Sequence, residues 1–154
     1  MTTLIKNGRI ITATDDYLAD ILVEGETIKA IGNDLNVNAG QEIDATGKLI
    51  FPGGIDPHVH LDMPFMGTYS SDNYETGTRA ALFGGTTMVI DFILQKQGNS
   101  LQSALDEWRG RSDGNCLGDY SFHMAVTDFN EHTKNEIKGL IENEGITSFK
   151  TFMA

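Results

Sequence analysis

The amino-acid sequence predicts an α/β protein in which parallel strands alternate with helices, preceded by a smaller β-rich region. After residue 52, strand-like apolar runs alternate with helix-like segments, which is typical of βαβ units and a parallel sheet. Before residue 52, short apolar runs are separated by turn residues, which is typical of a small β-domain. We therefore expect two domains, residues 1–52 and residues 53–154.

The first region contains three strand-forming stretches. "LIKNGRIIT" places apolar runs on both sides of Asn7-Gly8. "DILVEGETIKAIG" predicts a hairpin that turns at residues 25–26, and "EIDATGKLIF" predicts a second hairpin that turns at residues 46–47. No catalytic constellation is visible in these stretches, so they predict a β-domain without catalytic groups of its own.

Four strand-like and three helix-like segments make up the second region. The expected strands are "GIDPHVHLD", "TTMVIDFI", "DYSFHMAVT" and "ITSFKTFMA". The expected helices are "DNYETGTRAALFGG", "SLQSALDEWRGR" and "NEHTKNEIKGLIENEG". Capping-box patterns at Asp72 with Glu75 and at Asp128 with Glu131 predict two helix starts, and Ser100 predicts the third.

The order of these segments predicts part of a barrel. Four βα units are half of an eight-stranded (β/α)8 barrel, and the chain stops in the fourth strand with no room for a covering helix. The expected fold is therefore the first half of a TIM-like barrel, truncated after barrel strand 4.

Composition restricts the classes of partner. The 154 residues include 11 Lys and Arg against 22 Asp and Glu, a net charge of −11. This balance argues against nucleic acid and anionic membranes, because both attract basic patches. The single cysteine, Cys116, cannot form an internal disulfide, which suits a reducing compartment. The start lacks a signal peptide and no stretch reaches membrane-spanning length, so we expect a cytoplasmic protein.

Two of the four histidines occupy alternate positions of the first strand after residue 52, which has the character of a buried strand. Because side chains alternate between the two faces of a strand, His58 and His60 point the same way, together with Asp56 and Asp62. Two such imidazoles can each offer a neutral nitrogen to one metal ion such as zinc. The spacing arises easily by chance, but barrel enzymes hold their chemistry at this C-terminal end of a strand.

Lys150 stands in the middle of the last apolar strand. A lysine there is costly unless it is partnered or chemically altered, and a snorkelling lysine or a buried ion pair is the simpler interpretation. Together with His58 and His60, another interpretation becomes available. A neutral amine can react with carbon dioxide to form a carbamate, an anion that two divalent cations would stabilise.

Three segments carry a specific resemblance to a known family. "LIKNGRIITATD", "GGIDPHVHLDMPFMGTYSSDNYETGTRAALFGGTTMVIDF" and "GITSFKTFMA" resemble the hydantoinase/dihydropyrimidinase family of the amidohydrolase superfamily, and the likeness runs through the whole chain. The resemblance implies a (β/α)8 barrel with a small β-sandwich, to which residues 1–52 would contribute the N-terminal part. It also implies a binuclear metal site.

The resemblance assigns roles to individual residues. His58 and His60 would bind one metal ion, and Lys150 would be the carboxylated bridge between two ions, expected to be zinc or manganese. Two further histidines, an aspartate and a tyrosine of the family site are not in this chain. Met63, Phe65 and Phe152 could line an apolar pocket for a substituent of the substrate ring, or could simply pack the barrel mouth.

Other polar residues have simpler interpretations. His123 lies in the third strand of the second region, where the family has no ligand, so we expect it in the core or behind the metal ligands. His132 is expected on the surface. For Asp56 and Asp91 we expect hydrogen-bonding structural roles.

The resemblance implies a function for the full-length parent. It would hydrolyse the cyclic amide of hydantoins or dihydropyrimidines to N-carbamoyl amino acids, using two metal ions to activate water and polarise the carbonyl. The parent is expected to be a homo-oligomer, a tetramer or a dimer, and the 154 residues alone are expected to be inactive. Alternatives are a related allantoinase or dihydroorotase, or a non-enzymatic dihydropyrimidinase-like scaffold protein, against which the joint presence of His58, His60 and Lys150 counts.

Overall fold

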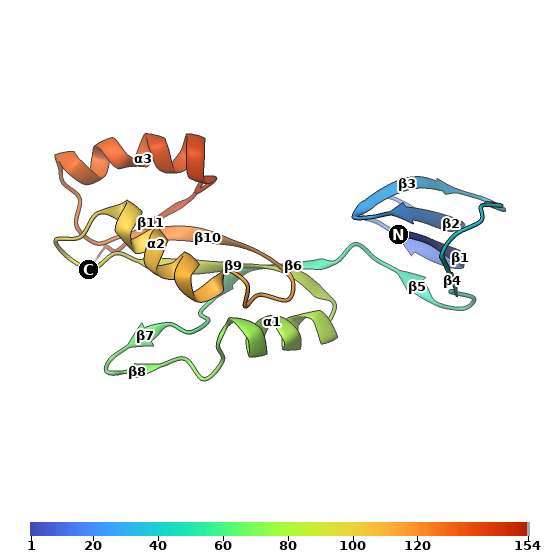
Figure 1. The fold of residues 1–154 in the computed structure, drawn as a ribbon, viewed down its shortest axis with the longest axis horizontal. Helices are drawn as coiled ribbons and strands as arrows, with labels where there is room; N and C mark the ends of the chain where they lie inside the picture. Colours follow the sequence, from blue (N-terminus) through green and yellow to red (C-terminus); the bar gives the residue numbers. More distant parts are fainter. Residues whose placement is uncertain (154) are drawn as a thin grey trace. The chain divides into compact units, whose positions relative to one another are not determined.

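The structure is a computed structural model that describes residues 1–153. The chain divides into two compact units, Met1–Pro52 and Gly53–Ala154 (Figure 1). Among residues 1–153, none of the helices has both the length and the apolar character needed to cross a bilayer.

The first unit is a five-stranded sheet. Its strand order is β3-β2-β1-β4, and β5 also pairs with β1. The β1–β2 and β2–β3 pairs are antiparallel, and the predicted hairpin turn at residues 25–26 joins β2 to β3 as expected. The strands are β1 (Thr2–Ile11), β2 (Asp16–Glu24), β3 (Thr27–Gly32), β4 (Gln41–Asp44) and β5 (Leu49–Ile50).

The second predicted hairpin, at residues 46–47, is wrong. Strands β4 and β5 do not pair with each other; both run parallel to β1 along the same edge. The turn between them faces an irregularity in β1, where the register shifts between Ile5 and Gly8 and Asn7 has a φ of 63°. The Ala45 amide donates to the Lys6 carbonyl at 2.8 Å, so the turn interrupts one edge strand instead of reversing the chain.

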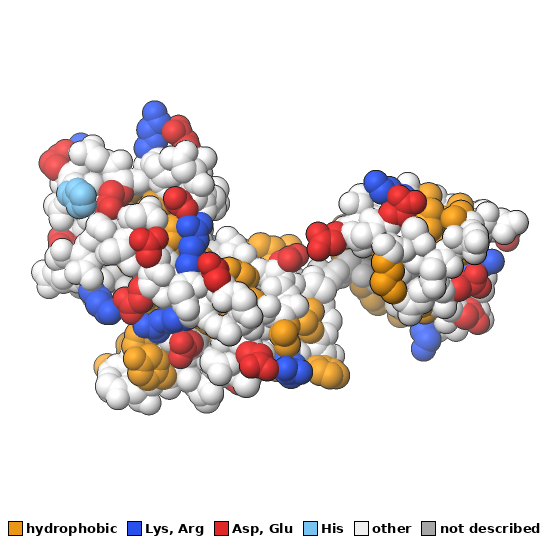
Figure 2. Space-filling model, viewed as in Figure 1, with side chains coloured by type: hydrophobic (Ala, Val, Ile, Leu, Met, Phe, Trp, Pro, Cys, Tyr) orange, Lys and Arg blue, Asp and Glu red, His pale blue; other side chains and the backbone are white. Residues whose placement is uncertain are grey.

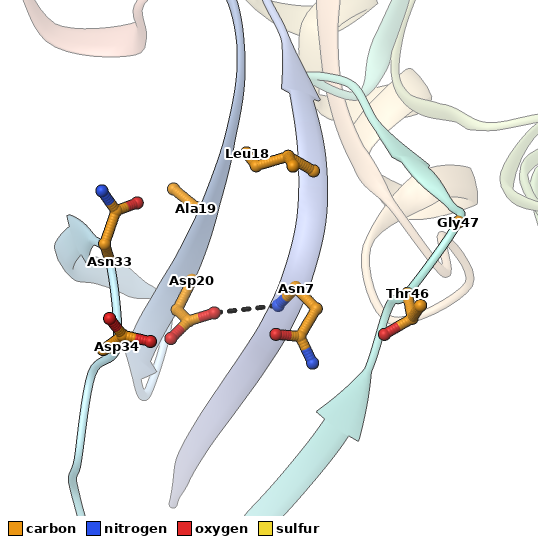
Figure 3. A pocket seen from close by; sticks show the side chains of 8 residues that line it. All are labelled: Asn7, Leu18, Ala19, Asp20, Asn33, Asp34, Thr46 and Gly47. Atoms are coloured by element: carbon orange, nitrogen blue, oxygen red, sulfur yellow. Dashed lines mark hydrogen bonds between the residues drawn. The ribbon is translucent and has the colours of Figure 1, made fainter.

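A buried carboxylate holds this irregularity in place. Asp20, 4% exposed, accepts hydrogen bonds from the Asn7 amide at 2.8 Å and from the Leu35 amide at 3.0 Å. Figure 3 shows Asp20 and Asn7 beside a cavity of about 560 Å³. Both bonds come from backbone amides that would otherwise be unpaired, one in the irregular part of β1 and one in the loop after β3. Asp20 therefore has a structural role.

The second unit is a parallel four-stranded sheet with the order β11-β10-β9-β6. One helix follows each of the first three of these strands along the chain, as the alternation predicted. The elements are β6 (Gly54–Val59), α1 (Tyr74–Phe83), β9 (Thr86–Leu94), α2 (Leu101–Ser112), β10 (Asp119–Val126), α3 (Glu131–Glu144) and β11 (Phe149–Thr151). The core between sheet and helices includes Ile93, Met124, Leu105, Trp108 and Leu140, each no more than 1% exposed.

Two of the three predicted helix caps are displaced. Ser100 caps α2 as expected, accepting from the Ser103 amide at 3.0 Å. The caps of α1 and α3 are Asn73 and Asn130, not Asp72 and Asp128. In each capping box, the backbone amide of the cap residue donates a hydrogen bond to the hydroxyl of the threonine three residues later. The sequence predicts a glutamate side chain as this acceptor.

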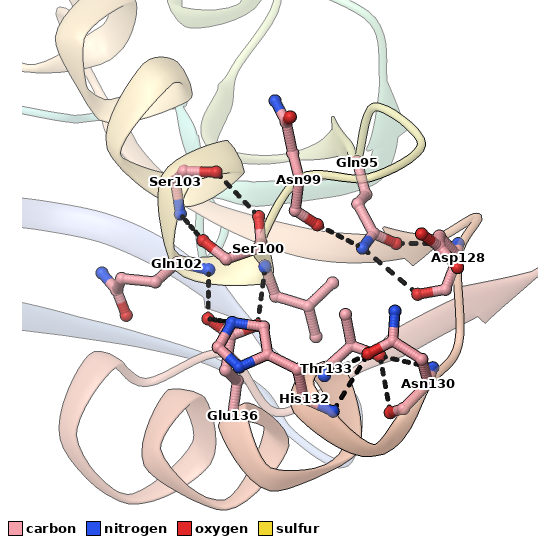
Figure 4. Close-up of polar contacts among 11 residues, drawn as sticks. Gln95, Asn99, Ser100, Gln102, Ser103, Asp128, Asn130, His132, Thr133 and Glu136 are labelled. Carbon is pink, nitrogen blue, oxygen red and sulfur yellow. Dashed lines mark hydrogen bonds and ion pairs between the residues drawn. The ribbon is translucent and has the colours of Figure 1, made fainter.

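Side chains also tie the outer helices together (Figure 4). Glu136 of α3 accepts from the Leu101 amide at 2.8 Å, so an anionic group lies at the positive end of α2. The Gln95 side chain, 3% exposed, accepts from the amides of Thr127 and Asp128 and donates to the Asn99 carbonyl. The loops after β9 and β10 are therefore joined through one buried amide group.

Candidate metal and substrate site

His58 lies near the C-terminal end of β6, and His60 directly follows the strand. Their ring centroids are 5.1 Å apart, and both rings contact the ring of Phe92 on β9, at centroid distances of 4.5 and 5.3 Å. The two imidazoles therefore share one face, as the strand alternation predicted. The expected burial of this strand is not found within residues 1–153, where β6 is an edge strand and both histidines are exposed.

Lys150, on β11 at the opposite end of the same sheet, reaches the same region. Its Nζ lies 4.4 Å from the Phe92 ring centroid and 5.3 Å from that of Phe152. Within residues 1–153, no carboxylate forms an ion pair with Lys150. The simpler interpretation, a buried ion pair, would need a carboxylate partner for Lys150, and the described part of the chain provides none.

The environment of His60 favours its neutral form. Partial burial, and then the nearby His58 and Lys150, lower the pKa of His60 below its ordinary value. A neutral imidazole retains the lone pair that a metal ion needs. Across residues 1–153 the structure contains no group of three His, Cys, Asp or Glu side chains placed to hold a metal ion.

Asp91 lies behind this face on β9 and is fully buried. Its carboxylate accepts hydrogen bonds from the Tyr74 hydroxyl at 2.7 Å and from the Leu61 amide at 3.1 Å, and lies 4.0 Å from Nδ1 of His60. Burial raises the pKa of Asp91, whereas these hydrogen bonds act in the opposite direction. Asp56 has a smaller role and accepts from the His58 amide at 3.1 Å.

The other two histidines face polar partners within the chain. His123 on β10 is half-buried and lies beside Phe92 on the same face of the sheet, with ring centroids 4.7 Å apart, and its Nε2 is 2.9 Å from the Pro57 carbonyl oxygen. Its Nδ1 contacts the Ser148 hydroxyl, so both ring nitrogens have partners within the chain. His132 is exposed on α3 and faces Glu136 at 3.7 Å.

The three residues predicted to form a pocket, Met63, Phe65 and Phe152, line one cavity. This cavity, of about 480 Å³, has both His60 and Lys150 in its wall. Most of its lining is apolar, as small-molecule sites commonly are. The remaining lining residues are Thr68, Tyr69, Ser70 and Leu94.

A short hairpin that we did not predict forms one wall of the cavity. Strands β7 (Pro64–Phe65) and β8 (Thr68–Tyr69) pair around Met66-Gly67, both of which have positive φ angles. Consecutive positive φ values are typical of a tight hairpin turn, for which glycine is the only sequence signal here. Figure 2 shows apolar side chains gathered on the surface over this segment.

Arg111 of α2 holds this hairpin and was also missed. It donates to the Asp62 carbonyl at 2.7 Å and lies over the rings of Tyr69 and Trp108, at 5.9 and 4.8 Å from their centroids. The sequence does not predict these contacts, because they join residues far apart in the chain and an arginine on a helix is usually exposed to solvent. The wall of the cavity is thus tied to the helix layer.

Comparison with known proteins gives consistent matches. The sequence pattern of the amidohydrolase family matches residues 49–139. A D-hydantoinase of Geobacillus stearothermophilus is 51% identical over 154 residues, which are 100% of this chain and 33% of that protein. A dihydropyrimidinase of Rattus norvegicus is 46% identical over 98% of this chain and 30% of its own length.

The solved structures agree with the sequence matches. The crystal structure of a dihydropyrimidinase from Brevibacillus agri superposes with a TM-score of 0.97 at 52% identity, over 100% of this chain and 33% of that one. The match confirms the predicted fold class, in which the parallel sheet is the first half of a (β/α)8 barrel. The chain spans about a third of the length of the relatives that it matches.

Proposed function

The chain belongs to the amidohydrolase family, and from that premise we propose that the full-length protein is a metal-dependent hydrolase of cyclic amides. Its substrates would be hydantoins and dihydropyrimidines, opened to N-carbamoyl amino acids, as the names of its relatives indicate. The observation that carries the proposal is the single cavity in which His60 and Lys150 face apolar side chains.

The residues present fit divalent metal ions, on which membership of this family implies dependence. His58 and His60 share a face, and the lowered pKa of His60 favours its neutral imidazole. Bound ions of this kind supply a water-derived nucleophile at neutral pH and polarise a carbonyl oxygen. We propose zinc or manganese, because imidazole donors suit the first and oxygen donors the second.

Lys150 would hold the ions as a carbamate. Its Nζ lies near the rings of Phe92 and Phe152, and no carboxylate in residues 1–153 forms an ion pair with it. The neutral amine forms a nitrogen–carbon bond to carbon dioxide and releases one proton, which leaves an anionic carboxylate. That carboxylate provides two oxygen donors where the unmodified side chain provides none.

The apolar residues would select the substituent on the ring. Phe65 and Phe152 lie in the cavity wall together with the two polar groups, so a ring held near His60 would extend its substituent toward them. An apolar wall binds an uncharged ring better than an acidic one, which favours hydantoins over dihydroorotate. We further propose a cytoplasmic location and a homo-oligomer, a tetramer or a dimer.

Ring opening by the full-length protein tests this function. We expect hydantoin and dihydrouracil to yield their N-carbamoyl amino acids, with much slower turnover of dihydroorotate and allantoin. Removal of metal by a chelator should abolish the activity, and zinc or manganese should restore it. Preference for dihydroorotate or allantoin would contradict the substrate class, and full activity of metal-free protein would contradict the mechanism.

A further inference from the structure

Asp91 is the one fully buried carboxylate next to the candidate metal ligands in residues 1–153, and its hydrogen bonds define its role. Oδ2 accepts from the Tyr74 hydroxyl at 2.7 Å and from the Leu61 amide at 3.1 Å, while Oδ1 accepts from the Phe92 amide at 2.6 Å. An ionised carboxylate has about four acceptor positions. Three are therefore filled by donors.

The remaining acceptor position belongs to Oδ1, which lies 4.0 Å from Nδ1 of His60. This distance is longer than a hydrogen bond, but hydrogen bonds in ligand-free sites are often long and shorten once the site is filled. A carboxylate whose other positions are occupied can only accept here. The His60 ring must then carry its proton on Nδ1 if it is to pair with Asp91.

The elements around Asp91 hold it firmly in place. Tyr74 is the first residue of α1 and is 1% exposed, and Leu61 directly follows His60 in the chain. Helix α1 also packs closely on this segment, since a Cβ at Gly77 would lie 2.4 Å from Leu61 Cδ2. Asp91 on β9 is thus fixed by the start of α1 and by the chain just after His60.

We infer that Asp91 is a positioning residue for His60, which fixes the imidazole proton on Nδ1 and leaves Nε2 as the metal donor. Histidine ligands commonly donate their other N–H to a carboxylate, which sets the tautomer and raises ligand basicity. The inference rests on the proposed function and adds to it a residue that touches neither metal nor substrate. His58, whose amide rather than its ring contacts Asp56, has no such partner in residues 1–153.

The first test reads the proton directly and needs no metal. Neutron diffraction from crystals of the metal-free full-length protein should place a deuteron on Nδ1 of His60 and none on Nε2. The Tyr74→Phe variant removes one donor but keeps the carboxylate, so the deuteron should stay on Nδ1. A deuteron on Nε2 alone in the wild-type protein overturns the inference, whether or not any variant folds.

The second test measures metal affinity by competition with a chelator for zinc. Asp91→Asn, whose amide group can donate as well as accept, should weaken affinity by about 10- to 100-fold. The same change should have little further effect in a His60→Asn background but its full effect in a His58→Asn background. Equal losses in all three backgrounds would mean that Asp91 only supports the fold.

The two tests also separate this inference from the proposed function. If the wild-type protein binds no divalent metal, the proposed function fails, while the neutron result still decides the tautomer. If metal binds and the ring opens but Asp91→Asn shows no coupling to His60, the function stands and the positioning role is wrong.

Discussion

The two sides of the parallel sheet treat polar side chains differently. On the helix side, Gln95 and Glu136 make hydrogen bonds to backbone groups of neighbouring loops and helices. On the side of the cavity, His58, His60 and Lys150 gather around the Phe92 ring, and none has an ion-pair partner within hydrogen-bond distance in residues 1–153. His123 lies on the same face, but both of its ring nitrogens have partners, so it belongs with the satisfied groups. Polar groups that the fold satisfies support structure, and those that it leaves unsatisfied are available for a ligand.

Pairs of identical residue types make the difference clear. Lys96 forms an ion pair with Glu107 at 2.8 Å, whereas Lys150 faces aromatic rings. His132 is exposed and lies 3.7 Å from Glu136 on the helix surface, whereas His60 lies in the cavity wall, 4.0 Å from the buried Asp91, with a lowered pKa. Residue type alone therefore does not identify a functional group; its surroundings in the fold are also needed.

The largest expected effect comes from the histidines of the cavity side. His58→Asn removes a proposed metal ligand. Loss of a residue that only hydrogen-bonds to a metal ligand lowers metal affinity or activity by about 10- to 100-fold, so we expect at least that loss here. His132→Asn is the matched control and should change neither. Metal analysis and ring-opening rates of the full-length variants check this, and equal effects of both substitutions would contradict the comparison.

A smaller effect, on stability alone, is expected on the helix side. Glu136→Ala removes a charged acceptor from the Leu101 amide, and hydrogen bonds to charged groups contribute about 1.5–3 kcal/mol to the free energy of unfolding. Glu142, exposed and 3.8 Å from Lys138, provides the control, because such a surface pair contributes only about 0–1 kcal/mol. Denaturant unfolding measures both. A loss of bound metal in folded Glu136→Ala would show that the two sides are not separable.

The smallest effect concerns substrate choice. Phe65 lines the cavity, whereas Met66, 89% exposed, does not. In the full-length enzyme, Phe65→Ala should raise kcat/KM for bulky aromatic substituents relative to small ones by a few fold, about 1 kcal/mol, with little change for an unsubstituted ring. Met66→Ala should leave the ranking unchanged. An equal loss for all substrates would mean that Phe65 only packs the barrel mouth.

Much of the fold could be predicted because its signals are local. The alternation of apolar runs and amphipathic segments after residue 52 predicts each βαβ element, and Ser100 predicts the start of α2. The parallel pairing of β4 and β5 with β1 depends on a bulge at Asn7, which lies far away in the sequence. The caps of α1 and α3 were predicted one or two residues too early, because the expected pattern has glutamate at the third helical position and these helices have threonine there.

The proposed ligands of the candidate site come from sequence patterns, whereas the contacts that support them do not. The alternation of His58 and His60 and the isolated charge of Lys150 indicate chemistry from single positions. The Phe92 ring that these three side chains share and the hold of Arg111 on the β7–β8 hairpin come from tertiary contacts between distant residues. No local pattern encodes such contacts.

The proposed metal site depends on a carbamate at Lys150, and the metal content of two Lys150 variants shows whether that bridge exists. Lys150→Ala removes the proposed bridge, and Lys150→Arg keeps a positive charge but cannot form a carbamate. We expect both full-length variants to lose metal and most activity, and a short carboxylate to restore part of both to Lys150→Ala. If Lys150→Arg keeps two metal ions per chain and near-full activity, Lys150 is an ordinary cation and the bridging carbamate is wrong.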